Sequence, residues 1–271
     1  NVLSILQQYL NNFENSANKK LINDLMINAF QNTSRYEQAF KKLEAIEYPS
    51  QKQKMAIQRL CFFIGVKAFN NADFNQAISL FENSNKYRVD DDVFAISTYW
   101  LDDCYFRLSD YSNSIKLYND YLSISLSSTT DFAQYNLAYA YFQQKDYEKA
   151  KSSFRKFIKI TKDSMRLNDA YLRTADCYFM LSDFRMAEKN YAKAISCNLF
   201  DADYALYNQS VCLGLIGKYS AKEKILKQFI ESHQKSIYFD DALLDLAVYY
   251  KNNNQKEKAL NSYNRLLDFI S

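Results

Sequence analysis

The chain has 271 residues and a net charge of +3, from 34 Lys and Arg against 31 Asp and Glu, and 16% of its residues are aromatic. Three Gly and one Pro are too few for the turns of a β-sandwich, a dinucleotide-binding fold or a disordered tail. Neither charge sign forms a long run, and no apolar stretch approaches the length of a membrane span. The composition therefore predicts an all-α fold, no nucleic-acid partner and no insertion of this segment into a membrane.

A short phrase recurs along the chain: a polar residue, an aromatic residue, two variable residues and a small residue. It is found at Arg35-Tyr36-x-x-Ala39, Asp73-Phe74-x-x-Ala77, Asp110-Tyr111-x-x-Ser114, Asp146-Tyr147-x-x-Ala150 and Asp183-Phe184-x-x-Ala187, with weaker copies at Lys218-Tyr219-x-x-Lys222 and Gln255-Lys256-x-x-Ala259. The small position moves through 39, 77, 114, 150, 187, 222 and 259, so neighbouring copies are 35 to 38 residues apart. Such spacing predicts a chain of stacked structural repeats.

Each phrase is expected to open a helix, because its Asp is a natural N-cap and apolar residues follow at helical spacing, as at Ala150, Phe154 and Phe157. A second helix is predicted to precede each phrase. Its small residue allows the two helices to approach closely. That place is filled by Gly65, Ala138, Ala175, Ser210 and Ala247, whereas Asp102 in the third repeat fits it poorly.

The order of these residues resembles the tetratricopeptide repeat. In the fifth repeat, the family's signature places are matched in order by Tyr171, Ala175, Tyr178, Ala187, Tyr191 and Ala194. The resemblance implies a right-handed α-solenoid of antiparallel helix pairs. The repeats run longer than the usual 34 residues, which is similar to the longer-helix variety in bacterial envelope-assembly proteins. The family's terminal Pro is absent except near the first repeat, where Pro49 comes close.

The predicted domain is a single array over residues 1–271. It comprises a half repeat at 1–16 and repeats at about 20–48, 54–86, 91–126, 131–162, 168–197, 202–234 and 239–270. No polar capping helix follows the last repeat, and solenoids need capped ends. The chain is therefore expected to be a segment of a longer protein with further repeats or domains.

In tetratricopeptide proteins a second stripe on the first helix of each pair lines a concave groove, so the resemblance implies that these side chains meet a ligand. The predicted groove residues are Arg59, Phe62, Val66 and Phe69; Ile96, Tyr99, Asp103, Phe106 and Arg107; Phe132, Tyr135, Tyr139 and Phe142; Asp169, Leu172, Asp176 and Phe179; and Tyr204, Tyr207 and Val211. An alternative interpretation is that neighbouring repeats bury many of these aromatic residues.

An aromatic groove suits an extended peptide or a partner helix, because Tyr and Phe give large contact area at low entropy cost. The chaperone-tail binders of the family place Lys and Asn in the groove, but this chain has Phe62, Tyr99 and Tyr135 there. Recognition of a chaperone carboxylate is not expected.

No residue pattern points to catalysis, a cofactor or a metal. Cys104, Cys177 and Cys212 recur at one repeat position, too far apart to form disulfides, and are interpreted as small buried residues. His233 lacks a partner at catalytic motif spacing. The acidic runs at 90–92 and 240–241 precede helices and are interpreted as caps and helix-dipole partners rather than as a calcium loop.

The leading hypothesis is a protein-interaction scaffold without enzymatic activity. One rival is a bacterial envelope component that helps to assemble or secrete surface proteins, which the long repeats favour and which would place the chain in the periplasm or cell envelope. Another is the regulatory arm of an enzyme encoded in flanking sequence.

Overall fold

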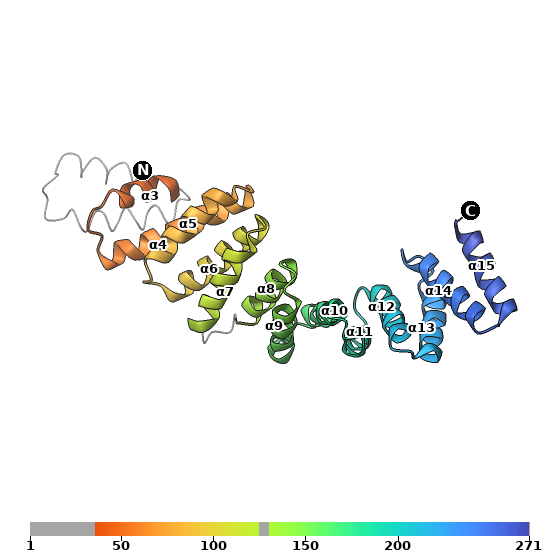
Figure 1. The fold of residues 1–271 in the computed structure, drawn as a ribbon. Helices are drawn as coiled ribbons and strands as arrows, with labels where there is room; N and C mark the ends of the chain where they lie inside the picture. Colours follow the sequence, from red (N-terminus) through yellow and green to blue (C-terminus); the bar gives the residue numbers. More distant parts are fainter. Residues whose placement is uncertain (1–35, 125–129, 271) are drawn as a thin grey trace, which may run out of the picture. The chain divides into compact units, whose positions relative to one another are not determined.

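The computed structural model describes residues 36–124 and 130–270, and every regular element in this part of the chain is a helix (Figure 1). The predicted all-α class is confirmed. The chain divides into two compact units, Asn1–Leu126 and Ser127–Ser271. The predicted half repeat at 1–16, most of the repeat at 20–48 and the connector between the third and fourth repeats lie outside the described residues. A single array over the whole chain stays a prediction.

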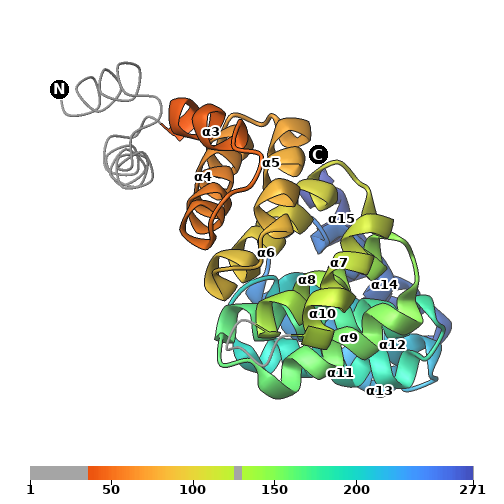
Figure 2. The same ribbon diagram turned by 90° about the vertical axis from the view of Figure 1, so that its left-hand side faces the viewer.

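The first unit consists of five described helices that pack in chain order. They are α3 (Tyr36–Glu44), α4 (Gln51–Asn70), α5 (Phe74–Lys86), α6 (Asp91–Arg107) and α7 (Tyr111–Ile124). Helices α3, α4 and α5 lie side by side in both ribbon views (Figure 1, Figure 2), and α4 also contacts α6. The α4–α5 and α6–α7 pairs are the second and third predicted repeats.

The second unit consists of eight described helices, and each packs against the next. They are α8 (Thr130–Gln143), α9 (Tyr147–Ile160), α10 (Ser164–Met180), α11 (Phe184–Cys197), α12 (Ala202–Leu215), α13 (Tyr219–Ser232), α14 (Phe239–Asn252) and α15 (Lys256–Ile270). These four pairs match the fourth to seventh predicted repeats. Helix α10 begins four residues before the predicted start at 168, because Asp163 caps it by accepting bonds from the amides of Met165 and Arg166.

The turn inside each pair has the same geometry in all six described pairs. One residue has a left-handed backbone with φ between 57° and 76°: Ala72, Ser109, Lys145, Ser182, Gly217 and Asn254. The amide of the residue that follows donates to a carbonyl five residues back, as Asp146 does to Tyr141 at 3.0 Å. This bond and the left-handed residue are the usual way to end a helix tightly.

The predicted aspartate caps are present at the start of the second helices. The side chains of Asp73, Asp110, Asp146 and Asp183 each accept a bond from a backbone amide three residues on. Lys218 opens α13 without such a bond. Aspartate caps therefore mark the starts of these four helices, whereas α13 follows the same left-handed turn, at Gly217, without a side-chain cap.

Small residues at the crossing of each pair are buried as predicted. Ala138, Ala175 and Ala247 have no exposed surface, and a Cβ atom at Gly65 would lie 2.6 Å from the Phe81 ring. The third repeat departs from this pattern, since Asp102 is fully buried there. All five cysteines are free; Cys61, Cys104, Cys177 and Cys212 are buried and Cys197 is partly exposed.

Candidate functional site

The predicted groove positions lie on the first helices of the repeats, α4, α6, α8, α10 and α12, and they differ in exposure. In each compact unit taken by itself, we call the surface formed by these positions the first-helix face. Ile96, Tyr99, Phe132 and Arg107 are exposed, with 45%, 38% and 36% of the surface of the first three accessible. The half-buried members are Arg59, Phe62, Val66, Phe69, Asp103, Phe106, Tyr135, Tyr139, Phe142, Asp169, Phe179, Tyr204, Tyr207 and Val211.

Leu172 and Asp176 do not face outward, so the prediction that they meet a partner is wrong. Leu172 has no exposed surface and packs in the core with Tyr191 and Tyr204. Asp176 is 7% exposed and accepts hydrogen bonds from both tyrosine hydroxyl groups. The next repeat covers both positions, and that effect cannot be derived from the periodicity of one helix alone.

In the first unit, charged and aromatic residues of α4 and α6 meet on this face. The Arg59 guanidinium forms an ion pair with Asp90 at 2.7 Å, and this contact is the largest cause of the lowered pKa of Asp90, the N-cap of α6. Arg107 lies over the Phe69 ring at 5.6 Å and pairs with Asp103 at 3.5 Å. These contacts hold the charged side chains of Arg59, Asp103 and Arg107 in place, whereas the side chains of Ile96 and Tyr99 stay exposed to solvent.

In the second unit, two tyrosines of α8 bind one carboxylate of α10. The hydroxyl groups of Tyr135 and Tyr139 donate to Asp169 Oδ2 at 2.8 and 2.5 Å. Burial, and then the charge of Asp169, raises the pKa of both tyrosines. The rings also pack on Phe154, at centroid distances of 6.1 and 5.3 Å. Both tyrosines are therefore fixed parts of the first-helix face, and their hydrogen bonds link the fourth repeat to the fifth.

Arg173 lies at the centre of this network. Its Nε atom is 3.5 Å from Asp169, and its Nη1 atom is 2.5 Å from Asp176 Oδ2. Tyr191 and Tyr204 each donate to Asp176 Oδ1 at 2.7 Å. Burial raises the pKa of Asp176, while Arg173 and the two hydroxyl groups act in the opposite direction. Arg173 therefore pairs with two carboxylates of its own helix, those of the half-buried Asp169 and the buried Asp176.

Sequence reasoning missed Arg173, although a signal was present. Asp169, Arg173 and Asp176 follow one another at spacings of four and three, which puts all three on one side of a helix. An aspartate four residues before an arginine predicts an ion pair. The register alone did not show that this pair lies at the junction with the next repeat.

Tyr207 of α12 and Tyr238 before α14 differ from the tyrosines of α8, because their hydroxyl groups do not bind an aspartate among the described residues. The rings of Tyr207 and Tyr238 stack at 5.3 Å with an angle of 10°. Within the described part of the chain, neither hydroxyl group makes a hydrogen bond. Burial raises the pKa of Tyr207 to about 12, and Asp245, Asp241 and Asp240 add to this effect. Leu244 and Val248, on α14, are 44% and 40% exposed.

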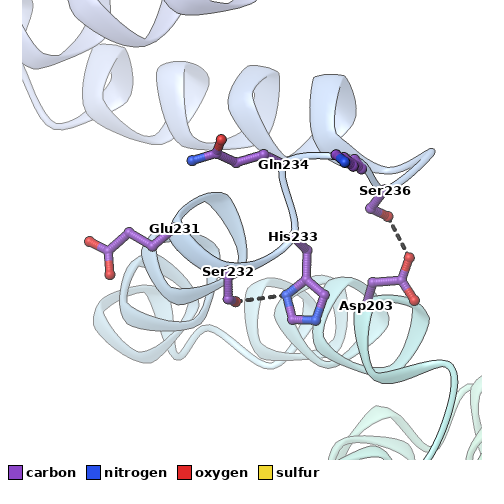
Figure 3. A pocket seen from close by; sticks show the side chains of 7 residues that line it. Asp203, Glu231, Ser232, His233, Gln234 and Ser236 are labelled. Atoms are coloured by element: carbon purple, nitrogen blue, oxygen red, sulfur yellow. Dashed lines mark hydrogen bonds between the residues drawn. The ribbon is translucent and has the colours of Figure 1, made fainter.

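An open pocket of about 600 Å³ at the end of α13 is lined by His233 (Figure 3). His233 Nδ1 lies 2.7 Å from Ser232 Oγ, and its ring stacks on Phe229. Asp203 instead accepts a bond from Ser236 at 2.6 Å (Figure 3), so these residues do not form a Ser–His–Asp relay. The described residues contain no group of three potential metal-ligating side chains, and none of their helices is long and apolar enough to span a bilayer.

Comparison with known proteins agrees with this architecture. Tetratricopeptide repeat models match residues 133–164 and 241–268. No curated protein matches the sequence.

Among solved structures, MamA is 20% identical with a TM-score of 0.57, over 66% of this chain and 93% of its own. YrrB, described as a TPR protein with an unusual peptide-binding site, is 19% identical with a TM-score of 0.56, over 70% and 91%. PilF of Pseudomonas aeruginosa is 13% identical with a TM-score of 0.53, over 79% and 91%.

At these identities the structural neighbours show the fold alone. The two family matches fall on the fourth and seventh repeats, and the same helix pair, turn and small-residue contact recur between them. Tetratricopeptide repeats are a family of protein-binding scaffolds. The chain is a tetratricopeptide-repeat protein.

Proposed function

We propose that the chain is an interaction scaffold that binds a peptide or a partner helix along the first-helix face of either unit. The observation that carries this proposal is the exposure of apolar side chains at repeated positions of that face. Ile96, Tyr99 and Phe132 are exposed, and the Phe132 ring also carries the Arg166 guanidinium at 4.1 Å, while the neighbouring groove residues are tied into ion pairs and ring contacts. Exposed apolar surface that a folded scaffold holds in place is typical of a protein-binding site.

The arrangement of the face supports binding with little rearrangement. Tyr135 and Tyr139 are each held by a hydrogen bond to Asp169 and by ring packing, so they lose little conformational freedom when a partner binds. The structural neighbour YrrB is described as having a peptide-binding site. Its likeness supports the same class of ligand for this chain.

The proposal is tested with exposed residues, because Tyr135 and Tyr139 also stabilise the fold. Ile96→Ser with Tyr99→Ser alters the face in the first unit, and Phe132→Ser alters it in the second. Tyr48→Ser and Ile160→Ser are matched controls, since both side chains are exposed but lie off this face. Proteins retained from a lysate of the source cell are compared by quantitative mass spectrometry, after circular dichroism has shown equal helicity.

We expect the face variants to lose partners that both controls retain, at about tenfold lower recovery for a site that buries these side chains. Identical sets of partners for all variants, with the fold intact, would remove the first-helix face as the binding surface. The envelope role, the periplasmic location and the regulatory-arm role stay proposals. A lipoprotein signal in the full-length gene supports the first two, and a catalytic domain supports the third.

A further inference from the structure

The second helices of the second unit have an excess of basic charge that its first helices lack. Helix α9 has five Lys or Arg against one Glu, and α11 has three against one. Helices α8 and α12 contain no Lys or Arg, and in α10 two Arg are matched by two Asp. The small net charge of the chain therefore conceals a separation of charge between the first and the second helices of this unit.

The basic side chains of α9 and α11 point away from the first helices. Both helices pack against α10, and the same register positions are buried in each, as Phe154 corresponds to Tyr191. Their opposite sides are exposed and, because the pairs repeat with the same register, face the same side of the unit. We call the exposed basic residues of these sides, with one from the connector that follows α9, the outer basic face: Arg155, Lys156, Lys159, Lys162, Arg185 and Lys189.

The charge of the outer basic face is not neutralised by the described part of the chain. None of its six side chains makes an ion pair or a hydrogen bond with another described residue. The acidic groups close to it in the sequence are engaged by other cations, since Glu148 pairs with Lys151 at 2.8 Å and Asp163 with Arg166 at 2.7 Å. Six unpaired cations on one surface favour an anionic partner.

Exposed aliphatic side chains beside these cations distinguish between the classes of anionic partner. Ile160, between Lys159 and Lys162 in the sequence, is 51% exposed, and Leu199, which follows α11, is 45% exposed. Aliphatic residues beside lysines can enter the headgroup region of a bilayer while the ammonium groups bind anionic lipids. No aromatic side chain of α9 or α11 is exposed, whereas proteins that bind single-stranded nucleic acid stack its bases on aromatic rings. A lipid surface therefore fits these residues better than a nucleic acid does.

We infer that the outer basic face docks the second unit on an anionic membrane surface, with Lys and Arg against the lipid headgroups and with Ile160 and Leu199 inserted shallowly between them. Clusters of about four to eight basic residues on an amphipathic helix are typical of such reversible binding, and α9 with its connector supplies four. The outer basic face lies on other helices than the first-helix face, so this inference does not rest on the proposed function. Docking in this way would leave the first-helix face open to a partner.

The inference is tested by sedimenting the 271-residue chain with vesicles of phosphatidylcholine, either alone or mixed with phosphatidylglycerol. We expect about tenfold stronger binding to the mixed vesicles, with the difference lost at high salt because salt screens the charges. Lys156→Glu with Lys159→Glu should lower binding to the mixed vesicles about tenfold or more. Ile160→Ser should lower it several-fold without changing its salt dependence, because this variant removes apolar contact and no charge.

Lys251→Glu with Lys256→Glu is the matched control, because it makes the same charge change at two exposed lysines of α14 and α15 outside the outer basic face. It should leave vesicle binding nearly unchanged, once circular dichroism has shown equal helicity of all variants. Equal binding to both kinds of vesicle, or an equal loss in the two double variants, would overturn the inference. Complete release of the chain from the vesicles by polyglutamate or single-stranded RNA, at the same concentration of anionic groups, would overturn it in favour of an acidic protein or a nucleic acid.

Discussion

Asp102 occupies the helix-crossing position where the other described repeats have Gly, Ala or Ser. Its Oδ1 atom accepts a bond from Ser114 Oγ at 2.5 Å, and its Oδ2 atom is buried without a partner among the described residues. Burial raises the pKa of Asp102 to about 9, although the bond from Ser114 acts in the opposite direction. The third repeat therefore carries a protonated carboxyl group in its core at neutral pH.

Replacing both partners, Asp102→Ala with Ser114→Ala, should stabilise the chain at pH 8. Ala138 and Ala150 already form this contact in the fourth repeat, and removing both polar groups leaves none unsatisfied. We expect a gain of about 1–3 kcal/mol in the free energy of unfolding. Urea denaturation followed by circular dichroism measures it.

The gain should depend on pH. Because the pKa of Asp102 is higher in the folded than in the unfolded chain, the folded chain holds an extra proton between about pH 4 and pH 9. Its stability therefore falls as the pH rises through that window, and the double variant lacks this fall. An advantage that is the same at pH 5 and pH 8 would contradict the raised pKa. Ser114→Ala alone should destabilise, since it removes the carboxyl group's hydrogen-bond donor.

The sequence shows which residues lie on the first-helix face but not how far each is buried. Ile96, Tyr99 and Phe132 are exposed and Leu172 is buried, although all four lie on the same predicted stripe of the first helices. What separates them is the neighbouring repeat, since Tyr204 comes from the next helix pair and packs with Leu172. Contacts between repeats depend on side chains about 30 residues apart, so the pattern of a single helix does not contain them.

At the scale of the helix pair, the turn is set by backbone geometry more than by residue type. Five of the six left-handed turn residues are not glycine, although a left-handed backbone favours glycine. The hydrogen bond across the turn and the aspartate cap that follows hold this geometry. For this reason the helix pairs could be predicted from the Asp caps and apolar spacing, even though the sequence has almost no glycine.

Lys145→Gly should stabilise the second unit slightly. Lys145 is exposed with φ at 62°, where a side chain costs about 1–2 kcal/mol and glycine costs none. The greater freedom of glycine in the unfolded chain offsets about 0.5–1 kcal/mol, so a net gain of about 0.5 kcal/mol is expected. Thermal unfolding by calorimetry measures the change.

The converse substitution supplies the control for this turn. Gly217 occupies the same place in the sixth repeat with φ at 76°, and no atom lies within 4 Å of an added Cβ. Gly217→Ala should therefore destabilise through backbone strain alone, by about 1 kcal/mol. If both substitutions shifted stability in the same direction, backbone strain would not be the cause.

At the scale of the whole molecule, the chain forms two compact units rather than one evenly packed body. The repeat spacing is as regular between the third and fourth repeats as elsewhere, so the sequence does not indicate this division. Helices in a solenoid contact mainly their neighbours, and stability is close to a sum over repeats. A unit with four complete helix pairs therefore has the core that it needs to fold alone.

Residues 127–271 expressed without the first unit should fold. We expect helix content per residue close to that of the second unit's helices in the chain, and a cooperative thermal transition within a few degrees of one found in the full 271 residues. Circular dichroism of the fragment and of the whole chain provides the comparison. A fragment without a cooperative transition would show that the second unit depends on the first.

The four buried cysteines also allow the opening of individual repeats to be measured. Cys61, Cys104, Cys177 and Cys212 lie in different first helices, are not paired, and have their thiol pKa raised to about 12 by burial. A thiol-specific reagent can reach each one when its own helix pair opens, and the partly exposed Cys197 provides an internal reference. Labelling rates would thus rank the opening of four repeats in the unmodified protein, with and without a bound partner.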